Sequence, residues 1–263
     1  MIEFFNETPL KEPLIFDTHA HYEDECFAED SDKMFSLFNQ KGVGKIITCG
    51  CDKCSSKKAL SLSEKYDYVY AAVGIHPGNI DSGTTVAEIE ELAKHKKCVA
   101  IGEIGLDYYW VQDNKQEQKA IFTSQLELAN SLNLPVLVHD RDAHADSLEI
   151  LKQYKPKGVV HAFSGSVEMA EEILKLGMYI GVGGVITFKN AKKLPDVVKM
   201  LPEDKLLLET DAPYLSPVPY RGKTNNSALI YLTAQKIAEL RNTTTEHILN
   251  ITFENAKKLF LKL

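Results

Sequence analysis

The sequence predicts an α/β protein whose eight parallel strands close into a (β/α)8 TIM barrel. Short apolar runs alternate with segments of helical periodicity along the whole chain, and this alternation gives eight strands. The length of 263 residues is close to the roughly 250 residues typical of such barrels. An open doubly wound sheet is the alternative, but its glycine-rich nucleotide fingerprint does not follow the first strand. We expect a single domain over residues 1–263.

The first predicted strand, residues 14–21, carries two histidines at its end. Three apolar residues lead into a polar segment, as in a buried strand that presents functional groups at its C-terminal tip. Residues two apart in an extended chain point to the same side. His19 and His21 can therefore direct both imidazoles to one point, as two ligands of a transition metal must.

Seven further strands are predicted from short apolar runs bounded by glycine, proline or polar residues. In order they are residues 45–49, 69–73, 98–101, 134–138, 158–160, 178–182 and 206–208. Because these runs alternate with helical segments, we expect a parallel sheet.

Helices are predicted where apolar residues recur at helical spacing, as Met34, Phe35 and Phe38 do within residues 31–40. Gly42 and Gly44 then break that helix. The next helices are expected at residues 54–66, 85–92, 115–132, 146–154, 168–176 and 191–200. Two more helices, residues 228–240 and 245–261, close the chain, and the last is additional to the eight-fold repeat.

Composition limits the classes of function. The net charge of −7, with acidic and basic residues interspersed, argues against a strong electrostatic hold on long duplex DNA but allows a basic rim around an active site. No apolar run approaches the ~20 residues that span a bilayer, and residues 1–11 lack a signal-peptide pattern. The odd number of cysteines, five, fits a reducing compartment. We expect a cytoplasmic protein without membrane association, and a monomer by default.

Six potential metal ligands stand at the ends of predicted strands. They are His19 and His21 after the first strand, Glu103 after the fourth, His139 after the fifth, His161 after the sixth and Asp211 after the eighth. In a barrel these ends converge on one rim. Four histidines and two carboxylates exceed the needs of one tetrahedral ion and suit two divalent ions bridged by a carboxylate and a water. Core histidines are the alternative for any single one, but their shared position argues against it for the set.

Seven motifs resemble the signatures of the TatD family of metal-dependent deoxyribonucleases. They are FDTHAH at 16–21, GIHP at 74–77, GEIGLDYY at 102–109, LVHDRDA at 137–143, HAFSGS at 161–166, LLETDAPYL at 207–215 and RGKTN at 221–225. The match runs from about Leu14 to Phe260, in register with the strand ends. The resemblance implies an amidohydrolase-like barrel with two divalent ions (magnesium, manganese or zinc). It also implies hydrolysis of DNA phosphodiester bonds, largely from strand ends.

The resemblance further implies an assignment of the ligands. His19, His21, Glu103 and Asp211 would bind one ion, and Glu103, His139 and His161 the other. One departure follows Asn225, where the family tends to have an acidic residue and a proline and this chain has Asn226 and Ser227. No ligand is lost, but the substrate selectivity of that loop is affected.

Two of the ligands are also candidate catalytic residues. Glu103 is placed to reach both ions, and Asp211 is our candidate for the general base that orients the attacking water. Glu209, on the same strand as Asp211, is interpreted as a supporting buried carboxylate rather than a ligand. Asp17 either holds a ligand imidazole in its tautomer or caps the first strand at the solvent.

Candidate contacts to the substrate, single-stranded DNA or a frayed end, lie in the same loops. The resemblance gives His76 such a role, with a structural turn histidine as the alternative. Three cations can meet phosphate: Arg141, Arg221 and Lys223. Tyr108, Tyr109 and Trp110 follow Glu103 closely and can either stack on an unpaired base or pack beneath the rim.

Two other functions compete with that of a deoxyribonuclease. The same barrel and metals could hydrolyse an amide, ester or lactone, although many such enzymes bridge their ions with a modified lysine where this chain has Glu103. A binding protein on a barrel without activity is the third candidate, and the complete set of ligand types argues against it. The pair Cys51 and Cys54 has no second C-x-x-C pair, so we interpret both as free thiols near the rim.

Overall fold

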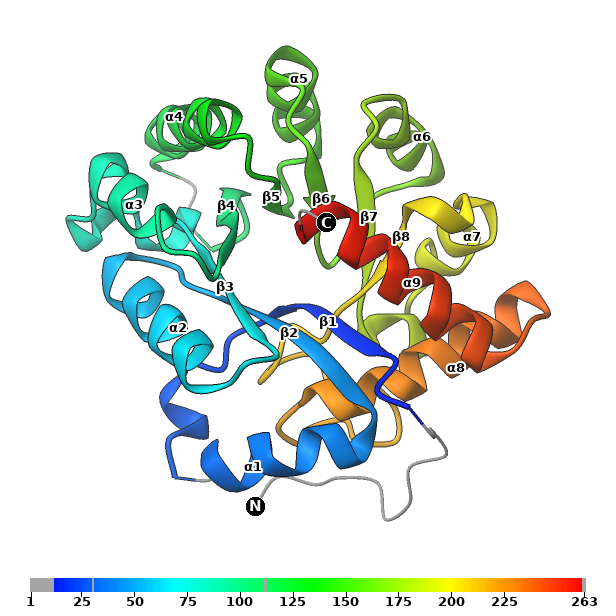
Figure 1. Cartoon of the computed structure of the whole chain (residues 1–263). Helices are drawn as coiled ribbons and strands as arrows, with labels where there is room; N and C mark the ends of the chain where they lie inside the picture. The colour runs from blue at the N-terminus through cyan, green and yellow to red at the C-terminus, as the bar shows by residue number, and fades with distance from the viewer. Residues whose placement is uncertain (1–11, 30, 111–112, 262–263) are drawn as a thin grey trace.

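Eight parallel strands form a single sheet in chain order in the computed structural model (Figure 1). The structure describes residues 12–29, 31–110 and 113–261. The strands are β1 (Ile15–Ala20), β2 (Val43–Cys49), β3 (Val69–Val73), β4 (Cys98–Asp107), β5 (Val136–Arg141), β6 (Gly158–Val160), β7 (Tyr179–Val182) and β8 (Leu206–Leu208). The chain just beyond β8 returns to β1, where Ala212 forms a parallel bridge with Ala20 and the Asp211 N–H donates to the His19 carbonyl at 2.9 Å. The predicted (β/α)8 barrel is confirmed.

Helices surround the sheet as an outer ring (Figure 1). They are α1 (Ser31–Phe38), α2 (Lys53–Lys65), α3 (Val86–Ala93), α4 (Lys115–Leu132), α5 (His144–Tyr154), α6 (Val167–Lys175), α7 (Leu194–Met200) and α8 (Ile230–Arg241). A further helix, α9 (Thr245–Phe260), lies across one end of the barrel (Figure 1). The local sequence determines where two of these helices begin. Helices α2 and α3 start with capping boxes, formed by Asp52 with Ser55 and by Thr85 with Glu88. No helix within the described ranges is long and apolar enough to cross a bilayer.

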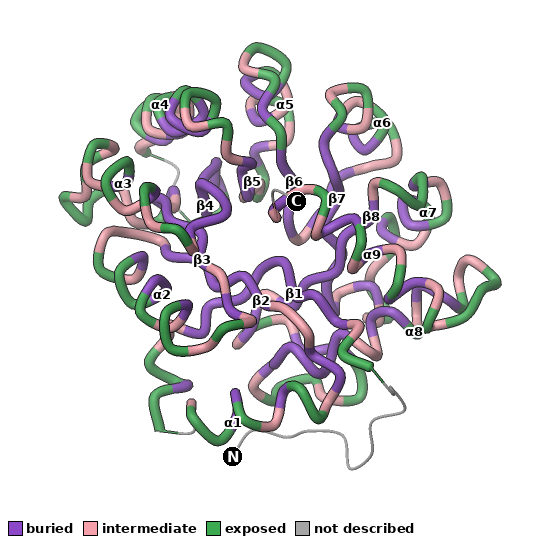
Figure 2. The backbone as a smooth tube through the Cα atoms, viewed as in Figure 1, coloured by how far each residue is buried: buried purple, intermediate pink, exposed green. Residues whose placement is uncertain are grey.

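The extra C-terminal helix, α9, seals the end of the barrel at which the strands begin. Buried residues run along the strands (purple in Figure 2), and those inside the barrel form one cluster with Ala256 and Phe260 of α9. The ring of Phe16, near the start of β1, lies 5.8 Å from that of Phe253 and 6.5 Å from that of Phe260, centroid to centroid. Because this end is filled, the opposite rim is the one left for a functional site.

The fourth strand is longer than the sequence pattern predicted, which is a correction. It was expected to end at residue 101, but β4 continues to Asp107, so Glu103 lies within the strand rather than after it. Glycines that look like breakers in the sequence instead allow close contact between strands: a Cβ on Gly105, whose φ is +148°, would lie 1.9 Å from the carbonyl oxygen of His139. Strand β5 likewise runs past His139 to Arg141.

Helix α7 is the other displaced element. It begins at Leu194 rather than at residue 191, so Lys192 and Lys193 lie in the loop before it. The remaining predicted boundaries agree with the structure to within two residues, the usual uncertainty of helix and strand ends.

We expect Phe260→Ala to lower the free energy of unfolding by about 3 kcal/mol, because it removes a buried ring from the sealed end of the barrel. Denaturant unfolding would measure this. Leu259→Ala is the matched control. Leu259 precedes Phe260 in α9 but is only half-buried, so its truncation should lower the free energy of unfolding by less. Equal losses in the two variants would show that α9 does not seal the barrel through Phe260.

Candidate metal centre

The carboxylate of Glu103 lies at the centre of the rim, and each of its oxygens faces a different pair of histidines. Its Oε1 is 2.7 Å from His139 Nδ1 and 2.7 Å from His161 Nε2. Its Oε2 is 3.4 Å from His19 Nε2 and 3.4 Å from His21 Nε2. The carboxylate is also buried, with Glu103 only 3% exposed. The arrangement offers one carboxylate oxygen to each histidine pair, which is the geometry a carboxylate needs if it is to serve two cations.

The spacing within each histidine pair fits a shared ion. His19 Nε2 and His21 Nε2 are 3.2 Å apart, and His139 Nδ1 and His161 Nε2 are 3.3 Å apart. Two nitrogens bound to one tetrahedral ion at roughly 2.0–2.1 Å would lie about 3.3 Å apart. The donor set therefore suits transition metals, and it matches the division of ligands that the family resemblance implies.

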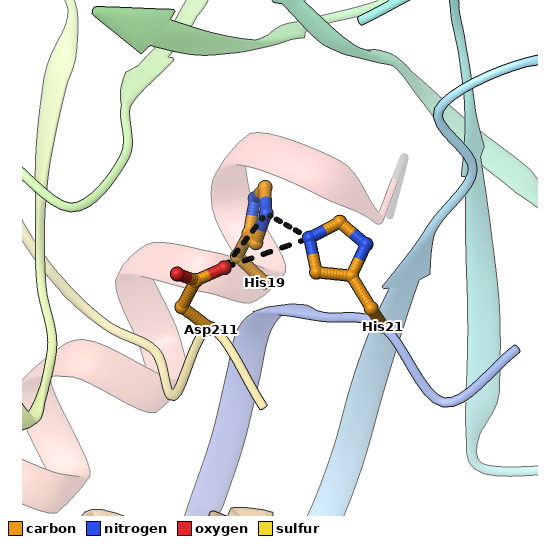
Figure 3. A group of neighbouring side chains, drawn as sticks. All are labelled: His19, His21 and Asp211. Atoms are coloured by element: carbon orange, nitrogen blue, oxygen red, sulfur yellow. Dashed lines mark hydrogen bonds and ion pairs between the residues drawn. The ribbon is translucent and has the colours of Figure 1, made fainter. Parts of the chain in front are cut away.

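Asp211 joins the first histidine pair from the loop that follows β8 (Figure 3). Its Oδ1 is 3.5 Å from His21 Nε2 and 3.8 Å from His19 Nε2. The residue has a left-handed backbone (φ 57°), which aspartate tolerates better than most residues. Burial alone would raise the pKa of Asp211, but contact with His21 and His19 holds it below its ordinary value. The carboxylate is therefore ionised at neutral pH.

Hydrogen bonds on the far side of the rings set which nitrogen is available to a metal. His21 Nδ1 is 2.8 Å from the carbonyl oxygen of Cys49, so this nitrogen carries the proton and Nε2 is left free to bind. His139 Nε2 is 3.1 Å from Asp107 Oδ2, which leaves Nδ1 for the metal. Although burial opposes it, Asp107 and Glu103 raise the pKa of His139 to about 9. Metal binding there must therefore displace a proton.

Asp17 occupies neither of the two positions considered from the sequence. It is fully buried, so it is no solvent-facing cap, and it accepts hydrogen bonds from the His19 backbone rather than from a ligand ring. Its carboxylate also accepts the Thr210 N–H at 3.0 Å and the hydroxyls of Thr210 and Ser227, each at 2.7 Å. Burial raises the pKa of Asp17 to about 6. Thr210 and Ser227 lie about two hundred residues from Asp17 in sequence, so no local sequence pattern indicates these contacts.

Glu209 lies behind His161, on the side of the ring away from Glu103. Its Oε1 accepts the Ala162 N–H and is 3.8 Å from His161 Nδ1. Its Oε2 and His161 Nδ1 are both buried without a hydrogen-bond partner among the described residues. Burial raises the pKa of Glu209 to about 8. This position suits the supporting role expected from the sequence, not that of a ligand.

Sequence reasoning did not single out two carboxylates of the centre, Asp107 and Glu23, and it interpreted Cys51 only as a free thiol near the rim. Asp107 orients His139, and Glu23 Oε1 lies 3.2 Å from His21 Nδ1. Cys51 lines the cleft with its sulfur 3.9 Å from the same His21 nitrogen, and burial raises its pKa to about 11. For Asp107 the available signal was spacing, because it stands an even number of residues beyond Glu103 in the same strand. Glu23 lies in the turn after β1 and has no such signal.

A cleft of about 1170 Å³ opens over the centre and receives some of the predicted substrate contacts. Arg141 lines it, as does His76. His76 lies closer to the metal ligands than expected, with Nε2 3.6 Å from Glu103 Oε1 and its ring 4.5 Å from that of His139. Trp110 also lines the cleft, so of the three consecutive aromatic residues the last is best placed to meet a substrate.

Four other predicted contacts lie outside the cleft as the described residues define it: Tyr108, Tyr109, Arg221 and Lys223. Tyr108 is buried and its hydroxyl donates to Asp146 of α5 at 2.7 Å, so the packing interpretation fits and the stacking one does not. Arg221 lies over the ring of Phe188 at 3.8 Å, and Lys223 is exposed on the same loop. The loop after β8 is long enough to carry both cations away from the centre.

Comparison with known proteins places the chain in a family. A model of the family described as TatD related DNase matches residues 16–261. The chain is 44% identical over 252 residues to the uncharacterized metal-dependent hydrolase YabD of Bacillus subtilis, with 94% of this chain and 99% of YabD covered. It is 35% identical to the uncharacterized metal-dependent hydrolase YcfH of Escherichia coli strain K12, with 94% and 96% covered.

A solved structure shows the same architecture. The crystal structure of YjjV, a TatD homologue from Escherichia coli K12, superposes with a TM-score of 0.86 at 34% identity, covering 94% of this chain and 98% of that one. The family resemblance of the motifs is thereby confirmed. The chain belongs to the TatD related DNase family of metal-dependent hydrolases.

Proposed function

We propose that this protein hydrolyses phosphodiester bonds of DNA at strand ends, with two divalent ions held at the rim. The observation that carries the proposal is the buried carboxylate of Glu103, which has a histidine pair on each oxygen at ion-sharing distances. Ions bound there would acidify a water and neutralise charge on the phosphoryl oxygens. The family description points to DNA as the substrate.

The chain's own residues supply the remaining functions. Asp211 faces the cleft as an ionised carboxylate, so it can orient the attacking water and accept its proton. Arg141 lines the same cleft and can donate hydrogen bonds to a phosphate oxygen. His76, beside Glu103, is placed to contact the reacting phosphate or its leaving oxygen.

A second candidate is hydrolysis of a carboxylic ester, amide or lactone at the same centre. The observation that favours it is a group of apolar side chains in the cleft: Phe163, Val185, Leu194 and Leu215. The two candidates differ in substrate, so one assay separates them. Metal-loaded protein should release nucleotides from end-labelled single-stranded DNA, tested in both polarities. Turnover of a panel of esters and lactones without nucleotide release would favour the second candidate.

Glu103→Gln should weaken both ion sites, because the amide loses the negative charge that the two histidine pairs share. We expect elemental analysis to find about two ions per wild-type chain and less than one in the variant. Asp146→Asn is the matched control, since Asp146 of α5 contacts Tyr108 and Lys119 rather than a candidate ligand and should retain the wild-type ion content. A single tightly held ion in wild type, unaffected by Glu103→Gln, would contradict the shared-carboxylate arrangement.

Asp211→Asn should leave the fold intact and at least one ion bound, while kcat on single-stranded DNA falls by about 10²-fold or more, the usual scale for a general base. The amide keeps the size of the side chain but cannot accept a proton. Asp142→Asn, a nearby rim residue that does not line the cleft, should change kcat by less than twofold. Asp211 would not be the base if the fully metal-loaded Asn variant cleaved DNA within a few-fold of wild type.

The net charge of −7 predicts that few phosphates are held at once. We therefore expect a shallow dependence of cleavage rate on salt, and faster digestion of single-stranded or frayed ends than of paired ends. Product ladders from linear and closed circular duplexes would measure this. Faster cutting within the closed circle than at linear ends would count against the proposal.

A further inference from the structure

The walls of the cleft carry opposite charges. On one side, the loops after β1 and β2 contribute carboxylates to the lining: Glu23, Asp24, Glu25 and Asp52. We call these residues the acidic wall. Across the barrel from β1 and β2, the end of β5 contributes the cation Arg141, and the loop before α7 contributes Lys192 and Lys193 (Figure 1). We call these the basic wall.

The acidic wall is fixed in position and poorly compensated. Glu23 accepts the hydroxyl of Thr48 at 2.6 Å, and Asp52 is held as the N-cap of α2. Asp24 caps the short 3-10 turn that follows β1, accepting the N–H of Cys26 at 2.8 Å. Among the described residues that line this side, Lys58 of α2 is the single cation. A phosphate passing here would meet repulsion from several carboxylates.

The basic wall continues into an exposed aromatic surface. The Arg141 guanidinium lies 4.1 Å from the ring centre of Tyr109 and 5.4 Å from that of Trp110. The two rings remain open to solvent, with Tyr109 51% and Trp110 70% exposed. Two carboxylates line this side as well: Asp140 is engaged by His144 at 2.8 Å, and Asp107 lies 3.1 Å from His139 Nε2. Exposed rings beside cations are the elements from which single-stranded nucleic acid sites are built.

We propose that a DNA strand leaves the metal centre over the basic wall alone, with a base stacked on Trp110 and phosphates on Arg141, Lys192 and Lys193. The inference rests on the proposed function and deepens it. The acidic wall then accepts the terminal nucleotide, which has no further phosphate, and rejects a strand that continues past the centre. Charge asymmetry across the cleft is therefore the physical cause of end-directed cleavage.

Binding to metal-loaded protein tests the basic wall. The probe is a short, fluorescently labelled oligothymidylate whose phosphorothioate linkages resist hydrolysis, followed by anisotropy. We expect the double variant Lys192→Ala/Lys193→Ala to raise Kd at least tenfold. Two lost phosphate contacts should also lower the slope of log Kd against log salt by about 1.4. Trp110→Ala should raise Kd by about tenfold.

Lys58→Ala is the matched control, because it removes a lysine from the opposite wall of the same cleft. Its Kd should remain within twofold of wild type. The basic-wall route is overturned if the double variant stays within twofold of wild type, or if Lys58→Ala weakens binding as much as the double variant does.

Circular single-stranded DNA tests the acidic wall. Wild type should digest linear single strands and leave the circle intact. The double variant Asp24→Asn/Glu25→Gln, in which the introduced asparagine amide oxygen can still accept the turn-capping hydrogen bond, should nick the circle at least tenfold faster than wild type does. A circle that stays equally resistant, while linear DNA is still digested, overturns the inference but not the proposed function. Wild-type protein that digests neither substrate overturns the proposed function itself.

Discussion

The rest of the structure depends on one buried carboxylate surrounded by imidazoles. Glu103 has five histidine rings within 3.6 Å of its two oxygens: His19, His21, His76, His139 and His161. A lone carboxylate in such a place would be costly to bury without compensating positive charge. The two cations of the proposed function would neutralise this charge between the carboxylate and the rings. In that proposal, metal binding and the burial of Glu103 depend on each other.

The contact that closes the barrel also brings the residues of this centre together. The bridge between Ala20 and Ala212 brings the end of β1 beside the chain that leaves β8, and this is how Asp211 reaches His19 and His21. The buried carboxylate of Asp17 ties the two segments together through Thr210. A change that loosened closure would separate ligands contributed by opposite ends of the sequence, so stability and metal affinity are coupled here.

The residues proposed to select the substrate lie in different elements from the residues of the candidate metal centre. The ligands come from strands or their immediate ends, where the sheet fixes their positions. The charged walls of the cleft come from loops and a helix start, where a substitution leaves the strands of the barrel in place. The net negative charge of the chain says little about this local asymmetry, because opposing charges are segregated across the cleft. A generally acidic protein can thus present a basic path to a short stretch of phosphates.

The sequence by itself determined the barrel and the ligand types. Alternation of apolar runs and helical segments reveals a parallel sheet, and parallel strands must end at one rim, so His19, His139, His161 and Asp211 could be grouped without coordinates. Only the tertiary structure decided which Glu103 oxygen faces which histidine pair, that Asp17 is buried against Thr210, and that Trp110 rather than Tyr108 faces the cleft. Periodicity reports the local chain, whereas these contacts depend on how β4 continues through Gly105 and how segments about two hundred residues apart pack together.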